Sequence, residues 1–186
     1  MDRIESRDLR VIIGASSQAY TGWIQTQEHE LDLTKRSDWE AGFRPGSITR
    51  LLAEHVWEHL SPDEAENAAR NCFDFLAPGG FFRCAVPDGL FPDPGYQHVV
   101  QVGGPGPADH PAASHQVVYD YRTLPIAFER AGFSVRLLEW WDEYGTFHAE
   151  PWDEREGFIY RSLRFDHRNR GVTPGFTSLI VDATKP

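Results

Sequence analysis

Residues 61–86 read SPDEAENAARNCFDFLAPGGFFRCAV, a stretch that joins the clearest helix of the chain to an apolar strand. Ser61 is placed to cap the helix, Pro62 suits its first position, and Glu64 completes a capping box three residues after the cap. One helical face then carries the apolar residues Ala65, Ala69, Cys72, Phe73 and Leu76. The Gly-Gly pair predicts the end of the helix, and GFFRCAV at 80–86 predicts the next strand.

Strand and helix patterns alternate on both sides of this unit. Apolar runs predict strands at LRVIIG (9–14), GWIQTQ (22–27), ITRLLAEH (48–55), FSVRLLEWW (133–141) and TSLIVDA (177–183), and TLPIAFERA (123–131) predicts a second helix. This alternation predicts one α/β domain over residues 1–186 with a largely parallel sheet. Ligands bind such sheets beyond the carboxyl ends of the strands, which points to GASSQ, EHVWEH and PDG.

Residues 87–117 interrupt this pattern with a segment dense in proline and glycine. A loop of this length inside a compact domain is typical of a functional lid or a disordered segment. We therefore expect a lid-like loop over 87–117.

Composition limits the classes of partner. The 186 residues carry a formal charge of −10, which disfavours nucleic acid and anionic membranes. The arginine-rich run RSLRFDHRNR (161–170) is a candidate for holding an anionic substrate group, although a solvated face is the simpler interpretation. The two cysteines form neither a metal-binding nor a disulfide pattern. The N-terminus is too charged for a signal peptide, and no apolar run is long enough to span a membrane. We expect a cytoplasmic protein with a small-molecule substrate, and a homodimer is one assembly open to it.

The stretch EHVWEHL (54–60) allows two interpretations. Its H-x-x-E-H spacing, from His55 to His59, matches a zinc motif of metalloproteases, which predicts a metal hydrolase with His110 or His115 as a further ligand. In those enzymes the motif lies inside one helix, whereas here it follows a strand and precedes the Ser61 cap. The pattern also fits a loop that follows a strand. We therefore favour the interpretation in which these residues do not bind a metal.

A series of short motifs resembles the class I S-adenosylmethionine-dependent methyltransferases, and within them the small predicted methyltransferases associated with glycan biosynthesis. The series runs in order through residues 10–186: VIIGASS, GWIQTQ, LDLT, EHVWEHL, LAPGGFFRCAVPD, SHQVVYDY, RAGF and SLIVDATKP. The resemblance implies a Rossmann-like fold with a mostly parallel central sheet and an antiparallel last strand. About eight residues separate Gly14 from Trp23, so we expect the first helix of that fold to be reduced or missing.

The same resemblance implies S-adenosylmethionine as the cofactor and assigns residues to it. The cofactor-binding positions are Gly14, Ala15, Ser16, Gln27, Asp32, Leu33, Glu54 and His55. His55 would face the methyl group, and a histidine suits a base because its ordinary pKa is near 6.5. Asp88 and His115 are the other catalytic candidates, and His59 and Tyr119 are the substrate-binding candidates. Each has a structural alternative: His59 as a helix cap, Asp88 as a turn residue, Tyr119 as core.

Two positions depart from the family pattern. GASSQ keeps one glycine where G-x-G is common, and Gln27 stands where an aspartate would bind the ribose. A neutral amide binds a diol less strongly than a carboxylate does. The leading expectation is a methyltransferase acting on a small molecule or a glycan precursor. The alternatives are a pseudoenzyme or partner subunit without cofactor binding, and the metal hydrolase.

Overall fold

A computed structural model describes residues 8–171 and 173–186. Its helices are α1 (Arg36–Gly42), α2 (Pro62–Phe75), α3 (Pro94–Val100) and α4 (Thr123–Glu129). Its strands are β1 (Leu9–Ile13), β2 (Trp23–Gln25), β3 (Ile48–Glu54), β4 (Leu76–Pro87), β5 (Ser134–Trp141), β6 (Phe147–Ala149) and β7 (Ser178–Thr184). Single 3₁₀ turns lie at η1 (Trp57–His59), η2 (Pro111–Ser114) and η3 (Glu154–Glu156).

All seven described strands form one sheet in the order β2-β1-β3-β4-β7-β5-β6. The strands β2, β1, β3 and β4 pair in parallel, whereas β7 lies antiparallel between β4 and β5. The short β6 adds an antiparallel edge to β5. This topology confirms the predicted Rossmann-like sheet with an antiparallel last strand. The strand order reverses direction between β1 and β3, and this reversal is the topological switch point.

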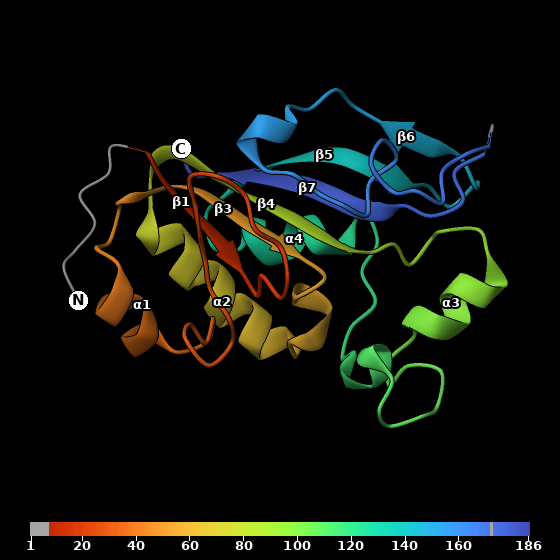
Figure 1. The fold of residues 1–186 in the computed structure, drawn as a ribbon, viewed down its shortest axis with the longest axis horizontal. Coiled ribbons are helices and arrows are strands. Elements are labelled where there is room, and N and C mark those ends of the chain that lie inside the picture. Colours follow the sequence, from red (N-terminus) through yellow and green to blue (C-terminus); the bar gives the residue numbers. More distant parts are fainter. Residues whose placement is uncertain (1–7, 172) are drawn as a thin grey trace.

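Helices cover one face of the sheet, where α1, α2 and α4 lie side by side in Figure 1. The core beneath them is aromatic: the Trp57 ring lies 5.2 Å from the rings of both Phe82 and Phe128. The capping box predicted for α2 is present, since the Ser61 hydroxyl accepts a hydrogen bond from Glu64 N–H and the Glu64 carboxylate accepts one from Ser61 N–H. Burial of this face determines which side chains of each strand point toward the helices.

The other face of the sheet is covered by residues 150–171 and 173–177, called the extended segment here, which contain the single turn η3 and no α-helix (Figure 1). Ile12, Leu52 and Ile180 are fully buried there against Ile159 and Trp152. The buried Arg83 anchors the segment by donating to the carbonyls of Asp153 and Gly157 at 2.8 and 2.7 Å. The described chain between β1 and β2 contains no helix, which confirms the prediction of a reduced or missing first helix.

Several element boundaries correct the sequence predictions. The helix that begins after Ser61 ends at Phe75, and β4 begins at Leu76 rather than at Gly80. Pro78 disfavours helical backbone at the residue before it, so the chain is already extended there. The segment 87–117, predicted as a loop, contains α3 and η2. The short elements α1 and β6 were not predicted, because fewer than eight residues give too little periodicity.

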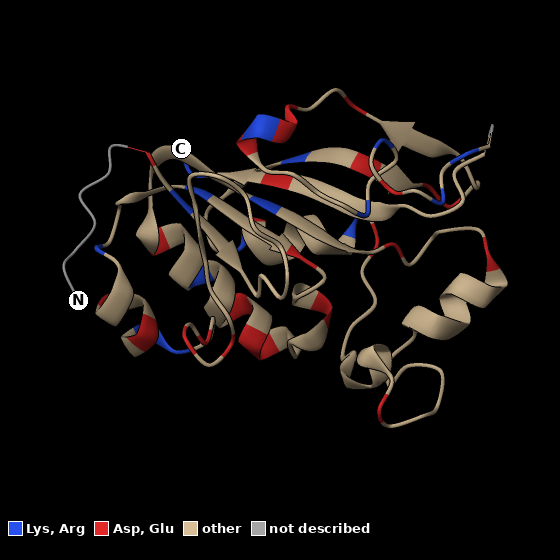
Figure 2. Cartoon of the chain, viewed as in Figure 1, with Lys and Arg blue, Asp and Glu red and all other residues tan. Residues whose placement is uncertain are grey.

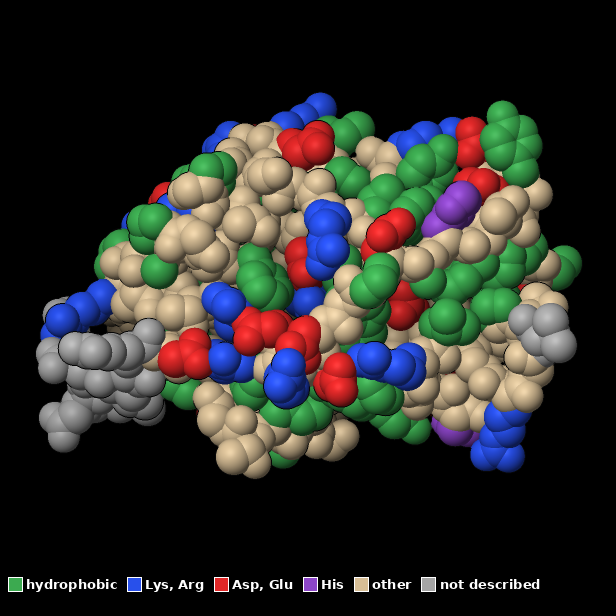
Figure 3. Space-filling model, turned by 90° about the horizontal axis from the view of Figure 1, so that it is seen from above, with side chains coloured by type: hydrophobic (Ala, Val, Ile, Leu, Met, Phe, Trp, Pro, Cys, Tyr) green, Lys and Arg blue, Asp and Glu red, His purple; other side chains and the backbone are tan. Residues whose placement is uncertain are grey.

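Charged side chains are unevenly distributed over the elements. Charges of both signs lie on the neighbouring strands β4, β7 and β5, whereas α3 and the chain that follows it are almost free of charge (Figure 2). Viewed from above the sheet, the surface mixes the two signs (Figure 3). The arginine run 161–170 does not form one basic patch, because its members are divided among separate partners: Arg161 with Glu54, Arg164 with Glu154 and Arg168 with Asp166. No helix among the described residues is both long and apolar enough to cross a membrane.

Candidate functional site

Two strained loops meet at the switch point, where β1 and β3 end. Among the described residues other than glycine, positive φ occurs only at Ser16 (47°) and His55 (58°), one in each loop. Gly14 also has positive φ, and a Cβ placed there would lie 2.7 Å from Cγ2 of Val56. Left-handed backbone at non-glycine residues is costly and clusters at functional sites. The sheet topology predicts a ligand-binding crevice between these two loops, so their junction is the first candidate for ligand binding.

Hydrogen bonds from the segment after β2 hold the turn after β1 in place. The Gln27 amide accepts a hydrogen bond from Ser16 N–H at 3.1 Å and donates one to Ser16 O at 3.0 Å. Ala15 N–H donates to Thr26 O, and the Ala15 side chain is fully buried. Both polar ends of the predicted ribose-binding amide are thus used to hold the turn.

Asp32 and Leu33 hold the loop between β2 and α1. The Asp32 carboxylate accepts from Thr34 N–H and the Thr34 hydroxyl and pairs with Lys35 at 2.9 Å. These hydrogen bonds, that of the Thr34 hydroxyl first, lower the pKa of Asp32. Leu33 is buried, and its carbonyl accepts from Trp39 Nε1 and Asn71 Nδ2.

Glu54 at the end of β3 faces the extended segment. Its carboxylate accepts from the backbone N–H groups of Tyr160 and Arg161 at 3.0 and 2.8 Å, and from the side-chain amide of Gln18. The residue is 6% exposed. A predicted cofactor contact therefore serves, in this structure, as the attachment point for residues 160–161.

His55 directly follows β3, in the second of the two loops. Its Nε2 is 2.9 Å from Ser178 Oγ, and its Nδ1 is 3.5 Å from Glu58 Oε1. Burial, and secondarily the charge of Arg161, holds the pKa of His55 well below its ordinary value. The imidazole is therefore neutral at neutral pH and has a lone pair to offer.

Glu58 lies near two histidines of its own loop, His55 and His59, and near His115, which is distant in sequence. Nitrogens of His59 and His115 and a carboxylate oxygen of Glu58 all lie within 4.8 Å of one another. The His59 and His115 rings are in edge contact at 4.9 Å. The structure thus brings together His55, His59 and His115 from the sequence predictions, whereas His110 instead accepts from Ala112 N–H. Glu58 was not among the predicted site residues, and the H-x-x-E-H spacing was its signal.

Asp88 and Tyr119 are fixed by backbone contacts. The fully buried Asp88 carboxylate accepts from Leu90 N–H and Trp141 N–H at 2.9 and 2.8 Å, which ties the end of β4 to the end of β5. Burial raises the pKa of Asp88 to about 6. Tyr119 bridges to Asp88 and is buried, and burial raises the pKa of its phenol. Both residues therefore fix the two ends of the segment 87–117 against the sheet.

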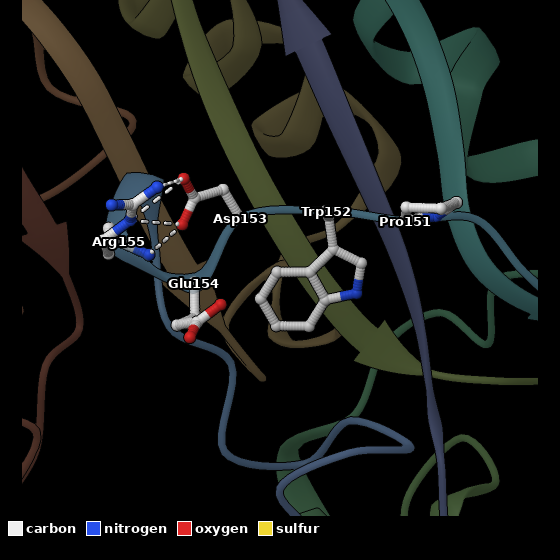
Figure 4. Close-up of a pocket in the computed structure, with 5 residues that line it drawn as sticks. All are labelled: Pro151, Trp152, Asp153, Glu154 and Arg155. Carbon is white, nitrogen blue, oxygen red and sulfur yellow. Dashed lines mark hydrogen bonds and ion pairs between the residues drawn. The ribbon is translucent and has the colours of Figure 1, made fainter.

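A separate hollow lies on the extended segment, lined by Pro151–Arg155. Figure 4 shows the Asp153 carboxylate and the Arg155 guanidinium paired at its side, with the Trp152 indole below them. The Arg155 carbonyl accepts from Arg10 at the start of β1. This hollow therefore adjoins the amino end of β1 rather than the switch point, and it offers no catalytic group to the crevice.

Comparison with known proteins identifies the fold. No family model and no curated protein matches the sequence. A S-adenosylmethionine-dependent methyltransferase of Archaeoglobus fulgidus matches with 11% identity, 96% of this chain, 86% of that chain and a TM-score of 0.53. One from Mesorhizobium loti matches with 13% identity, 98% and 93% coverage and a TM-score of 0.52. A chain of the Haloferax volcanii complex that contains the Trm112 methyltransferase activator matches with 15% identity, 98% and 84% coverage and a TM-score of 0.56. The chain shares the fold of these structures.

Proposed function

We propose that the protein is a S-adenosylmethionine-dependent methyltransferase acting on a small molecule, with a glycan precursor as the narrower candidate. One observation carries the proposal: the strained loops that end β1 and β3 meet at the switch point of a sheet with the methyltransferase strand order. Fold alone does not imply function, so the side chains at this switch point decide which chemistry the protein can perform.

His55 supplies a buried, neutral imidazole to this site. Its Nε2 contacts Ser178, and its Nδ1 makes no hydrogen bond to any described residue. Methyl transfer is an in-line displacement at a sulfonium, which requires an aligned nucleophile and, for a protonated acceptor, removal of a proton. The His55 ring is oriented by Ser178, and its second nitrogen faces the Glu58 side of the site. We assign His55 as the group that orients and deprotonates the acceptor.

Cofactor contacts in this proposal come from the turn after β1 and the loop after β2. Gly14 provides close approach of the backbone, and Asp32 is partly exposed beside Lys35. Gln27 acts through Ser16 by holding the turn. Glu54 likewise acts by fixing residues 160–161 against the site. Asp88 and Tyr119 position the lid, and the acceptor meets His55, His59 and His115.

Calorimetric titration with S-adenosylhomocysteine tests cofactor binding. We expect a Kd in the micromolar range, on the order of −7 to −8 kcal/mol. Absence of binding at millimolar ligand would contradict the proposal. Gly14→Val is the matched control, because a β-branched side chain is excluded by φ of +59° and by contact with Val56.

A His55→Asn variant tests the assigned base. Asparagine adopts left-handed backbone more readily than most residues, so this change preserves the loop while it removes the imidazole. We expect turnover to fall by about 10²- to 10⁴-fold with little change in cofactor affinity. Unchanged turnover would show that His55 has no part in the chemistry.

A second candidate function follows from Gln27 and Glu54. Because their polar atoms are satisfied within the chain, the crevice has fewer free groups for a ribose and a methionine than the family pattern provides. This favours a methyltransferase-fold subunit that supports a partner and does not itself bind the cofactor. The same titration separates the two functions, since a Kd below about 100 µM, near −5.5 kcal/mol, excludes the second.

A further inference from the structure

Glu58 is a buried carboxylate without a hydrogen-bond partner. Its side chain is 1% exposed, and neither oxygen receives a hydrogen bond from the residues that the structure describes. An uncompensated buried carboxylate is costly and is normally paired, protonated or bound to a metal.

The three histidines around Glu58 are oriented alike. His115 donates its Nδ1–H to Val100 O at 2.8 Å, because a carbonyl can only accept, and this leaves Nε2 unprotonated in the neutral ring. His59 Nδ1 lies 2.8 Å from Ser114 Oγ, while its Nε2 lies 4.0 Å from Glu58 Oε1. His55 is held by Ser178 through Nε2 and turns Nδ1 to Glu58. Each ring thus has an outer partner and an inner nitrogen.

This pattern is the one that metal-binding histidines adopt. A ligating imidazole almost always gives its other nitrogen to a carbonyl, a carboxylate or another fixed group, which sets the tautomer and the ring orientation. A carboxylate with two or three imidazoles is a donor set for first-row transition metals, and not for calcium or magnesium. The ligand atoms, within 4.8 Å of one another, need to approach by about 1 Å to bind at ordinary metal–ligand distances.

We propose that Glu58, His59 and His115 bind one divalent transition-metal ion, with His55 beside the site as the base. The ion neutralises the Glu58 charge and joins η1 to the chain that follows η2. It also ties the lid to the switch point, because His115 is held by the end of α3 through Val100.

The metal site gives the acceptor a chemical class, and this step rests on the proposed methyltransferase function. A hydroxyl oxygen of the acceptor coordinates the ion, which lowers the hydroxyl pKa, and His55 takes its proton. The resulting oxyanion attacks the methyl carbon, an O–C bond forms, and the C–S bond breaks to give a neutral thioether. A hydroxyl on a small molecule is therefore the expected acceptor.

Titration of the whole chain with Co²⁺, followed by its visible absorption, tests the site without any cofactor. We expect one ion per chain and an absorption typical of nitrogen and oxygen ligands, with Zn²⁺ displacing it. Glu58→Gln should weaken binding by about 100-fold or more, and Ser114→Ala, which removes only the partner of His59, by about tenfold. His98→Ala is the matched control, because His98 is an exposed histidine on α3.

Thermal unfolding keeps the test independent of folding defects. Glu58→Gln replaces a buried carboxyl that has no hydrogen-bond partner among the described residues by an amide of the same shape, so the metal-free variant should melt close to the wild-type temperature. Zn²⁺ should raise the wild-type Tm only. Absence of a Co²⁺ spectrum at millimolar metal, or equal binding by Glu58→Gln and wild type, would overturn the metal site. S-adenosylhomocysteine binding is measured separately, so a failed metal site and a failed methyltransferase proposal give different results.

Discussion

Gly14 and His55 determine the shape of the crevice through their backbone. Both have φ near +60°, and the loops that contain them touch at Val56. A left-handed conformation costs a non-glycine residue about 1–2 kcal/mol, so the fold retains His55 in it against that cost. The contact between the loops explains why the first loop needs glycine at this position.

We expect Gly14→Ala to lower the free energy of unfolding by about 1–3 kcal/mol. The cause is twofold: unfavourable φ, and a Cβ 2.7 Å from Cγ2 of Val56. Urea unfolding of Gly14→Ala, Val56→Ala and the double variant measures the two parts. In the double variant, the loss of unfolding free energy caused by the clash with Val56 should disappear, and the loss caused by the positive φ should remain. If the losses of the two single variants simply add in the double variant, the contact between Gly14 and Val56 is refuted.

Asp88 makes stability depend on pH. Its pKa rises from 3.8 to about 6 on folding, so between these values the native state keeps a proton that the unfolded state has lost. The free energy of unfolding therefore falls as pH rises through this window, by up to about 3 kcal/mol, and levels off above it.

Asp88→Asn isolates this effect in denaturant titrations at a series of pH values. The amide keeps one acceptor for two backbone donors, so the variant should be less stable at low pH by about 1–3 kcal/mol. Its deficit should shrink as pH rises from 4 to 6.5. A deficit that stays constant over this range would show that Asp88 does not titrate there.

At the scale of elements, α2 is the helix whose ends the local sequence explains best. Its capping box satisfies two backbone donors at the amino end. We expect Ser61→Ala to cost about 1 kcal/mol in unfolding free energy, since both reciprocal hydrogen bonds depend on the hydroxyl or its geometry. Glu64→Gln is the matched control, because glutamine also completes a capping box, and it should change stability by less than about half as much. If both variants lose the same unfolding free energy, the stabilisation comes from the charge of Glu64 and not from the capping hydrogen bonds.

At the scale of the whole molecule, the extended segment covers the second face of the sheet, on which the described residues form no α-helix. Arg83 forms a two-pronged pair with Asp182 at 2.8 and 2.9 Å and also binds two carbonyls of the segment. The pair is buried, whereas the Arg155–Asp153 pair on the same segment is exposed. The segment is therefore held by buried polar groups as much as by apolar packing.

We expect Arg83→Met to lower the unfolding free energy by about 3–5 kcal/mol, because it leaves the Asp182 carboxylate buried without its main partner. Hydrogen exchange should increase across residues 150–165 before the rest of the sheet. Arg155→Met, which breaks an exposed pair, should change stability by less than about 1 kcal/mol. Uniform exchange across the sheet in Arg83→Met would show that the segment is not anchored there.

Local sequence determined the parts of this protein that depend on neighbours along the chain. The apolar runs and the Ser61 capping box predicted most strands, two helices and the α/β sheet, because periodicity and capping act within a few residues. The Gly-Gly pair predicted the end of α2 wrongly, since the helix ends at Phe75 and both glycines lie in β4. The missing first helix was also evident from the short spacing between Gly14 and Trp23.

Tertiary structure alone decided the partners of the polar groups. Only folding brings His115 against His59 and Glu58, turns Gln27 onto Ser16, and places Glu54 under residues 160–161. These contacts join residues 11 to 107 positions apart, and a burial-driven fold selects them through the packing of whole elements. The H-x-x-E-H spacing can be recognised from neighbouring residues. The approach of His115 to this motif and the burial of Glu58 are properties of the folded chain.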